Sequence, residues 1–251
     1  MKIDIAKKEI IHFIGIGGIG MSGLAQIMKN MGFSVQGSDE NGGKNIERLL
    51  KSGIKVNIGH NKNNIKKATM IVASSAIKKN NKELIESRRK KIPVYKRGEM
   101  LANIVSLKKN IVIGGSHGKT TTTSLVANIL VESGLDPTVI NGGVINSLKN
   151  TAQLGKGEWA VIESDESDGS FLGLPITYSI VTNLDKEHLN FYGSFDKLKK
   201  SFLKFIQNTP SIGKSFICLD DFNLKSIIKK SRKANLLTYG FNKKQIIKSV
   251  M

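Results

Sequence analysis

Residues Ile111–Thr123 read IVIGGSHGKTTTT, and the chain is organised around this stretch. The apolar start predicts a buried strand, and Ser124–Glu132 has the apolar spacing of a helix. A strand, a glycine turn and a helix N-terminus form a cradle for phosphate, because backbone N–H groups converge on the anion and the helix dipole attracts it. In such a loop Lys119 reaches the outer phosphates of a nucleotide and the Thr120 hydroxyl binds Mg²⁺.

The match to the P-loop motif is partial. The full motif has a glycine where this chain has Ile113, and the nearest glycine on that side is Gly115. The ordinary alternative is a glycine-rich turn that only starts a helix. We favour the phosphate loop because Gly118-Lys119-Thr120 follows a predicted strand and opens a predicted helix.

A second glycine loop lies near the N-terminus. Residues Gly15–Gly20 (GIGGIG) satisfy the pattern G-x-G-x-x-G between an apolar strand, Glu9–Ile14, and a helical stretch, Met21–Met31. Asp39 ends the next predicted strand 19 positions after the last glycine, where an acid meets a ribose in a dinucleotide fold. The pattern predicts a Rossmann-type half that binds a pyrophosphate of unspecified origin. A tight turn without a ligand is the minor alternative.

Predicted strands and helices alternate along the chain, which indicates an α/β fold with parallel sheets and ligands at the carboxyl ends of the strands. Lys108-Lys109-Asn110 is polar and a second series begins there. We therefore expect a Rossmann-like domain over residues 1–107 and a P-loop ATPase-type α/β domain over residues 108–251. Asn141-Gly142-Gly143 predicts either a plain turn or a close approach of backbone to a ligand.

Two polar runs follow apolar strands in the second half. Trp159–Ile162 leads into Glu163–Asp168, which holds four acids in a basic chain. Mg²⁺ needs carboxylate oxygens beside phosphates, so Glu163 at the strand end is the first candidate, and a solvated acidic loop is the alternative. Tyr178–Val181 leads into TNLDKEH, whose His188 lies just past a strand end at the same expected sheet edge. A surface histidine is the commoner alternative.

Composition narrows the class of protein. The chain has 251 residues, a formal net charge of +19 and few aromatic residues, and its lysines are scattered, which favours a basic surface suited to nucleotides over a nucleic-acid interface. Cys218 is the single cysteine, expected as a buried strand thiol, so neither disulfides nor a cysteine metal site are expected. No apolar run has membrane-spanning length and no signal peptide is apparent, so we expect a soluble cytoplasmic protein of undetermined oligomeric state.

The run Gly-Ser-His-Gly-Lys-Thr-Thr-Thr resembles the shortened P-loop of the Mur ligases, ATP-dependent enzymes that add amino acids to the peptidoglycan precursor. GIGGIGMSGLA, ESDESD and TNLDKEH also resemble motifs of that family, and the resemblance covers essentially all 251 residues. The histidine between Ser116 and Gly118 is similar to that of the alanine-adding branch. The resemblance implies that the carboxylate of UDP-N-acetylmuramate attacks ATP, and that the amine of L-alanine then displaces phosphate from the acyl-phosphate.

The resemblance also implies roles for individual residues. Those near the UDP-sugar would be Gly15, Gly17, Gly18, Ile19, Gly20, Ser38, Asp39, Ser74 and Ser75, although helix-capping serines are an equal reading of the last two. Those near ATP would be Gly115, Ser116, His117, Gly118, Lys119, Thr120, Thr121 and Asn183. The Mg²⁺ ligands would be Thr120, Glu163 and His188, with Glu166 only weakly implied, and the catalytic set would be Lys119, His117, Glu163 and His188. Asn190 stands where many relatives have an aspartate, so no role is carried over to it.

The family carries a third, C-terminal Rossmann-like domain that helps to bind ATP and the amino acid. We therefore expect a truncated ligase that binds the UDP-sugar but turns over poorly, with its amino-acid choice left open. Three alternatives stay open: the related ligase that recycles murein tripeptide, a non-catalytic nucleotide-binding module, and an NAD-dependent oxidoreductase built on Gly15–Gly20. The last leaves the P-loop unexplained, and no catalytic Cys, Tyr-x-x-x-Lys or His-Asp relay is apparent.

Overall fold

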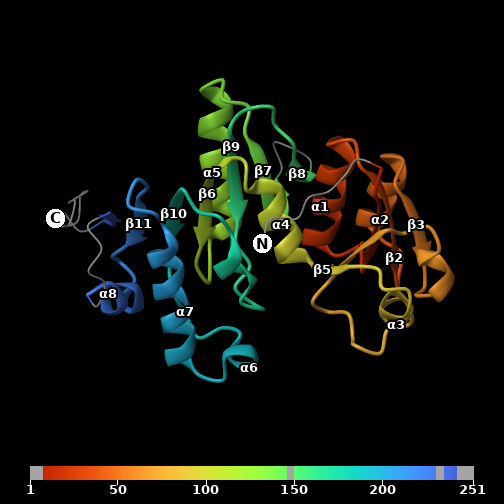
Figure 1. Ribbon diagram of the computed structural model, residues 1–251. Helices are drawn as coiled ribbons and strands as arrows, with labels where there is room; N and C mark the ends of the chain where they lie inside the picture. Colours follow the sequence, from red (N-terminus) through yellow and green to blue (C-terminus); the bar gives the residue numbers. More distant parts are fainter. Residues whose placement is uncertain (1–7, 146–149, 230–234, 242–251) are drawn as a thin grey trace. The chain divides into compact units, whose positions relative to one another are not determined.

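The computed structural model describes residues 8–145, 150–229 and 235–241. Contacts between residues divide the chain into two compact units, and each is built from strands and helices (Figure 1). Unit 1 comprises Met1–Ile104 and Ile140–Leu154, and unit 2 comprises Val105–Val139 and Gly155–Met251. None of the described helices combines the length and the apolar character needed to cross a bilayer.

In the described part of unit 1, five parallel strands form a sheet in the order β3-β2-β1-β4-β5. The chain runs outward from β1 through β2 to β3, and then crosses to β4 on the other side of β1. The order therefore reverses at β1, which is where ligands bind in open parallel sheets. The elements are β1 (Ile10–Ile14), α1 (Ile19–Asn30), β2 (Ser34–Asp39), α2 (Lys44–Lys51), β3 (Lys55–Ile58), η1 (Lys62–Ile65), β4 (Met70–Ala73), α3 (Lys82–Arg89), β5 (Val94–Lys96) and α4 (Arg97–Val105).

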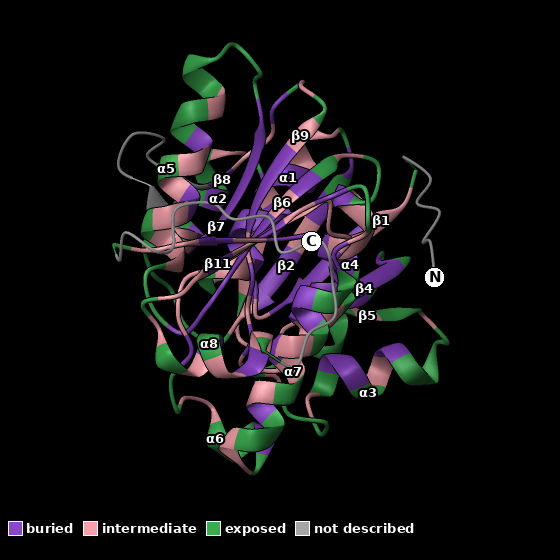
Figure 2. Cartoon of the chain, turned by 90° about the vertical axis from the view of Figure 1, so that its left-hand side faces the viewer, coloured by how far each residue is buried: buried purple, intermediate pink, exposed green. Residues whose placement is uncertain are grey.

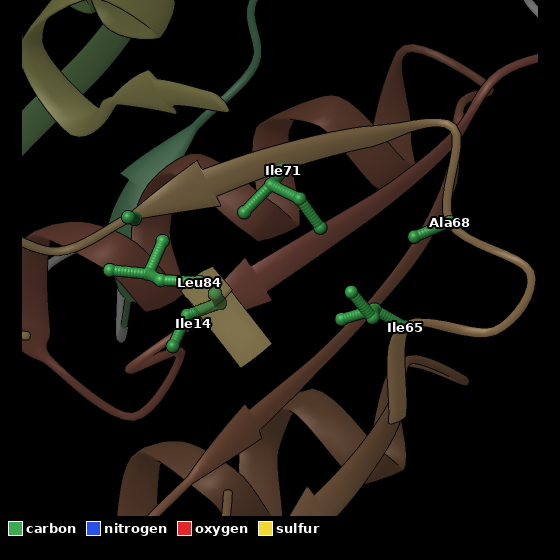
Figure 3. Close-up of a cluster of buried hydrophobic side chains, with 6 residues drawn as sticks. Ile14, Ile65, Ala68, Ile71 and Leu84 are labelled. Atoms are coloured by element: carbon green, nitrogen blue, oxygen red, sulfur yellow. The ribbon is translucent and has the colours of Figure 1, made fainter. Parts of the chain in front are cut away.

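Apolar side chains hold η1 and α3 against this sheet. Ile65 of η1 and Leu84 of α3 pack with strand residues in one buried cluster (Figure 3), because each element turns its apolar side inward. The side chain of Asn81 caps α3 by accepting hydrogen bonds from the N–H groups of Glu83 and Leu84. The labelled members of the cluster are Ile14, Ile65, Ala68, Ile71 and Leu84.

The second sheet has the order β12-β11-β10-β6-β9-β7-β8, and the pairs from β12 to β9 are parallel. Its strands belong to unit 2 except β8 and the part of β7 from Ile140 onward, which fall in unit 1. Strands β9 and β10 flank β6 on its two sides, so the loops that follow these three strands share one edge. The elements are β6 (Lys109–Gly114), α5 (Lys119–Glu132), β7 (Thr138–Ile145), β8 (Asn150–Gln153), β9 (Trp159–Glu163), η2 (Ser170–Gly173), β10 (Tyr178–Val181), α6 (Leu189–Tyr192), α7 (Phe195–Asn208), β11 (Ser215–Cys218), α8 (Phe222–Ile228) and β12 (Leu236–Tyr239).

Aromatic residues form part of the core of unit 2. The ring of Phe171 lies 5.3 Å from that of Phe202 and 5.2 Å from that of Phe205, centroid to centroid. Both partners belong to the buried face of α7, and the Ser194 side chain caps that helix by accepting a hydrogen bond from Lys197 N. Figure 2 shows that the strands are largely buried (purple), whereas the outward-facing turns of the helices are exposed (green).

The α/β fold class predicted from the sequence is confirmed, and two local predictions are wrong. Asn141-Gly142-Gly143 lies inside β7 rather than in a turn, since the strand continues to Ile145. Cys218 at the end of β11 is half-buried rather than buried. Helix α5 begins at Lys119, so Gly118-Lys119-Thr120 opens a helix as predicted.

Candidate functional site

The P-loop segment turns tightly between β6 and α5. Gly115 has φ +138° and Gly118 has φ +76°, which are backbone conformations that favour glycine. A Cβ atom on Gly115 would lie 2.0 Å from the Thr182 hydroxyl oxygen, so any other residue would push β6 away from the loop after β10. The N–H groups of the first turn of α5 have no acceptor within the helix and are open to an anion.

Lys119 is folded across this loop. Its Nζ donates to the carbonyl oxygens of Gly115 (2.6 Å) and Ser116 (3.1 Å), and to Oε1 of Glu166 (2.8 Å). The ammonium group is thus held at the mouth of the loop, beside the amides of the helix N-terminus. A phosphate arriving there would meet both a charge and a set of oriented N–H groups.

Thr120 faces the end of the neighbouring strand. Its Oγ1 donates to the Glu163 carboxylate, whose two oxygens both lie 3.0 Å away. The register of the sheet explains this meeting, because Glu163 pairs with Ile113 just before the P-loop begins. A hydroxyl and a carboxylate side by side are the oxygen donors that Mg²⁺ prefers.

Glu166 is the most unusual acid of the second unit. It is 3 % exposed, Oε1 is bonded to Lys119, and Oε2 is buried without a hydrogen-bond partner. Burial raises the pKa of Glu166, although the neighbouring Lys119 works against that rise. The Tyr192 hydroxyl donates to the Glu166 carbonyl oxygen and anchors α6 beside it.

Glu166, Glu187 and His188 lie close enough to hold one cation, since single ligand atoms from the three are within 4.8 Å of one another. His188 Nε2 is 3.7 Å from Glu166 Oε1. The Glu166 oxygen without a partner fits the role of a metal ligand. A buried acceptor without a hydrogen bond raises the free energy of the folded protein, and a bound cation would lower it. These residues therefore suit a divalent cation.

The segment after β10 braces the P-loop from its other side. Asn183 accepts from His117 N (2.8 Å) and donates to His117 O (3.0 Å), and the Thr182 hydroxyl donates to the same carbonyl oxygen (2.7 Å). The exposed His117 ring lies 3.3 Å from Asp185 Oδ2 and 3.7 Å from Glu187 Oε1. The structure thus uses Asn183 to hold the loop backbone, a contact that the sequence alone did not predict.

In unit 1 the glycine loop follows β1 and is tied to the end of β2. The Ser38 carbonyl oxygen accepts from Gly15 N (2.9 Å) and Ile16 N (3.0 Å), and Asp39 Oδ2 accepts from Gly17 N (2.7 Å). Gly15 has φ +80°, so the sharp turn requires a residue without a side chain. Helix α1 then begins at Ile19, and the N–H groups of its first turn have no acceptor within the helix.

The serines predicted near the UDP-sugar occupy different environments. Ser38 is fully buried, Ser74 is half-buried beside the turn at Gly15, and Ser75 is exposed. The Ser74 hydroxyl accepts from Ala76 N, which is a local turn contact. Direct contact between these serines and a ligand stays a prediction.

The structure assembles the predicted residues into two groups. In unit 2, Lys119, Thr120, Glu163 and His188 surround the P-loop together with Glu166, while Thr121 and Asn190 are exposed on helices α5 and α6. In unit 1, the glycine loop, Asp39 and Ser74 lie together at the end of β1. The resemblance implied a metal-binding role for Glu166 only weakly, and that role stays a prediction; Glu166 stands three residues after Glu163 within the acidic run.

The fold and the site together define an α/β protein with two parts: a Rossmann-like sheet and a second sheet that carries a P-loop of the nucleotide-binding type. Two family models match the chain. The Mur ligase family, catalytic domain, matches residues 10–109, and the Mur ligase middle domain matches residues 113–250. The chain belongs to the Mur ligase family.

Curated relatives support the same family. The chain is 64% identical over 244 residues to a UDP-N-acetylmuramate–L-alanine ligase of Pelagibacter ubique, covering 97% of this chain and 53% of that protein. It is 54% identical over 232 residues to the ligase of the same name from Parvibaculum lavamentivorans, covering 92% and 47%. The chain therefore spans about half the length of these relatives.

Two solved structures are similar in fold. The UDP-N-acetylmuramate-alanine ligase of Thermotoga maritima is 29% identical with a TM-score of 0.84, covering 93% of this chain and 53% of that one. The UDP-N-acetylmuramate:L-alanyl-gamma-D-glutamyl-meso-diaminopimelate ligase of Neisseria meningitides is 26% identical with a TM-score of 0.86, covering 93% and 78%.

Proposed function

We propose that this protein is an ATP-dependent ligase that joins L-alanine to the carboxylate of UDP-N-acetylmuramate in peptidoglycan precursor synthesis. Unit 1 is proposed to bind the UDP-sugar and unit 2 to bind ATP. The names and the identities of the curated relatives support the substrates. The observation that carries the proposal is the contact of Lys119 with the P-loop carbonyl groups and the buried Glu166.

The chain's own groups have defined tasks in the proposed reaction. The amides at the start of α5 would bind the phosphates, and Lys119 would leave its loop carbonyl groups to contact the outer phosphate. Asn183 would keep the loop in shape through its two bonds to the His117 backbone. The carboxylate of the sugar would attack the terminal phosphorus, and the bond to the β-phosphate oxygen would break with release of ADP. The amine of L-alanine would then attack the acyl carbon of the acyl-phosphate, releasing phosphate and a proton.

Thr120 and Glu163, with Glu166 and His188 beside them, are the residues proposed to hold Mg²⁺. When bound, the ion would neutralise charge on the phosphate oxygens and orient them. The unpartnered oxygen of Glu166 and the oxygen donors of Thr120 and Glu163 support this assignment.

A coupled assay tests the proposal. The 251-residue chain would be given ATP, Mg²⁺, UDP-N-acetylmuramate and L-alanine, and ADP and the alanyl product would be measured. Glu163→Gln should remove ADP formation, whereas Glu158→Gln, at the exposed residue just before β9, should leave it unchanged. ADP formation by Glu163→Gln at the wild-type rate would contradict the proposed site. The slow turnover expected from the sequence stays a prediction that the same assay measures.

The murein tripeptide ligase is the second candidate, supported by the fold similarity to the Neisseria structure. The same assay with L-alanyl-γ-D-glutamyl-meso-diaminopimelate in place of L-alanine separates the two. Product with L-alanine alone supports the first candidate, and product with the tripeptide alone supports the second.

A further inference from the structure

A buried carboxylate lies beneath the end of β2 in unit 1. Glu83 of α3 is fully buried, and both of its oxygens accept hydrogen bonds. Oε2 lies 2.6 Å from Ser38 Oγ and 3.4 Å from His12 Nε2, and Oε1 lies 2.6 Å from Asn64 Nδ2 and 3.2 Å from Asn61 N. The donors come from β1, β2, η1 and the loop before η1, so one side chain ties four segments together.

Glu83 is held in its charged form by these donors. Burial works to raise the pKa of Glu83, but the hydrogen bonds from His12, Ser38 and Asn64 outweigh it and hold the pKa below its usual value. An ionised carboxylate only accepts hydrogen bonds. Every neighbour within bonding distance of Glu83 must therefore present a proton to it.

This requirement decides which nitrogen of His60 carries a proton. The single hydroxyl proton of Ser38 is donated to Glu83, so Ser38 Oγ can only accept from its other neighbour. That neighbour is His60 Nδ1, at 3.1 Å, which is also 3.5 Å from Glu83 Oε2. Both contacts of Nδ1 are acceptors, so Nδ1 carries the proton and, in the neutral ring, Nε2 is an acceptor.

The neighbouring His12 has the opposite tautomer, with the proton on Nε2. The Gln36 side-chain amide nitrogen donates to Asn64 O (3.0 Å) and to His12 Nδ1 (3.2 Å), so His12 Nδ1 is an acceptor and its Nε2 carries the proton toward Glu83. His12 is fully buried and both of its nitrogens are used. His60, by contrast, has no described side chain bonded to its Nε2.

His60 also lines a surface cavity of about 620 Å³ at the end of β3. Val56 and Ile58 contribute apolar surface to it, and Ile58 is 59 % exposed, a suitable face for a flat ring. Ile58 is paired with Asp39 across β2 and β3. The glycine loop, Asp39 and the cavity thus follow one another along the ends of β1, β2 and β3. This is the order of pyrophosphate, ribose and base in a nucleotide.

We propose that His60 recognises the base of the nucleotide bound by unit 1, with Nε2 accepting a hydrogen bond from the N3–H group of uracil. Glu83 and Ser38 are positioning residues that hold His60 in the required tautomer. The inference rests on the proposed UDP-sugar function. Cytosine has an acceptor in place of that N–H group, so two acceptors would face each other and cytosine would be rejected.

Nitrogen NMR of the histidine-labelled chain tests the tautomer without a ligand. The chain has four histidines, and His60→Gln identifies the His60 signals by their loss. We expect the Nδ1–H form at His60 and the Nε2–H form at His12. Glu83→Gln should give a mixture at His60, whereas Glu86→Gln on the same helix should change nothing. An Nε2–H form at His60 in the wild-type chain would overturn the proposal.

Calorimetric titration with UDP and CDP tests base recognition. We expect the wild-type chain to prefer UDP by about tenfold or more, and His60→Ala to reduce the preference to within about twofold. His60→Gln, which keeps a donor toward Ser38 and an acceptor toward the base, should retain most of the preference. UDP binding with an unchanged preference in His60→Ala would overturn base recognition alone. Failure of the wild-type chain to bind UDP would contradict the UDP-sugar proposal as well.

Discussion

Glu83 in unit 1 and Glu166 in unit 2 are both buried glutamates, and their surroundings differ in one decisive respect. Both oxygens of Glu83 accept hydrogen bonds, and the pKa of the group is lowered. Glu166 has one oxygen on Lys119 and one without a partner, and its pKa is raised. A satisfied carboxylate stabilises the surrounding segments, whereas an unsatisfied one is stabilised only when a ligand arrives.

The largest expected effect is on the P-loop side of this comparison. Lys119→Met removes the ammonium group that contacts Gly115, Ser116 and Glu166, and with it the charge proposed to meet the outer phosphate. We expect ADP formation with all substrates present to fall by at least about 10²-fold. Retention of more than a tenth of the wild-type rate would contradict the assigned role.

Glu83→Ala should have the largest effect on stability. It leaves the buried donors of His12, Ser38 and Asn64 without their acceptor, and we expect a loss of about 3–5 kcal/mol. Hydrogen-exchange mass spectrometry should show lost protection in β1 and β2, with β6 and β9 unchanged. Glu86→Gln, which removes the half-buried partner of the exposed Arg89 on the same helix, should leave protection of β1 and β2 unchanged. Full protection of β2 in Glu83→Ala would contradict the bracing role.

The effect expected of Glu166→Gln is the reverse of that of Glu83→Ala: stability without a ligand changes little, and stabilisation by the ligand is lost. It removes a buried charge that has hydrogen bonds on one oxygen only, so stability without Mg²⁺ should change by less than about 1 kcal/mol. Addition of Mg²⁺ and a non-hydrolysable ATP analogue should raise the thermal midpoint of the wild-type chain and not that of the variant. Equal stabilisation of both chains would show that Glu166 is not a ligand residue.

The smallest effect is a pair of opposite pH trends. Because the pKa of Glu83 is lowered by folding, its contribution is present above the unfolded pKa and is lost as the pH falls through the folded pKa. Because the pKa of Glu166 is raised, its ionisation costs stability, and stability is regained as the pH falls through the folded pKa toward the unfolded one. The wild-type advantage in thermal midpoint over Glu83→Gln should therefore shrink on acidification, and that over Glu166→Gln should grow. If acidification changed both advantages in the same direction, the opposite pKa shifts of Glu83 and Glu166 would be contradicted.

The sequence predicted the fold well because its strands are short apolar runs between turn residues. The strand Tyr178–Val181 has the predicted bounds, and β1 (Ile10–Ile14) differs from the predicted Glu9–Ile14 by one residue. The ends of such strands also indicate where polar side chains gather, so Glu163 was found beside Thr120. Local patterns carry this information without tertiary contacts.

What the sequence did not show depends on distant contacts. Glu83 lies among lysines and arginines in a helical stretch, which is typical of a solvated face, yet it is buried by Ser38 and His12 from other elements. The tautomer of His60 follows only from the hydrogen bonds around Ser38, which join residues of distant elements. The unequal partners of Glu166 are likewise a tertiary property.

The most direct test of the proposed function is calorimetric titration of the 251-residue chain with UDP-N-acetylmuramate and, separately, with NADH. The proposal places a uridine nucleotide on the glycine loop of unit 1, so it predicts saturable binding of the UDP-sugar and no binding of NADH. Binding of NADH without binding of the UDP-sugar would contradict it, and would make the glycine loop a site for a nicotinamide cofactor.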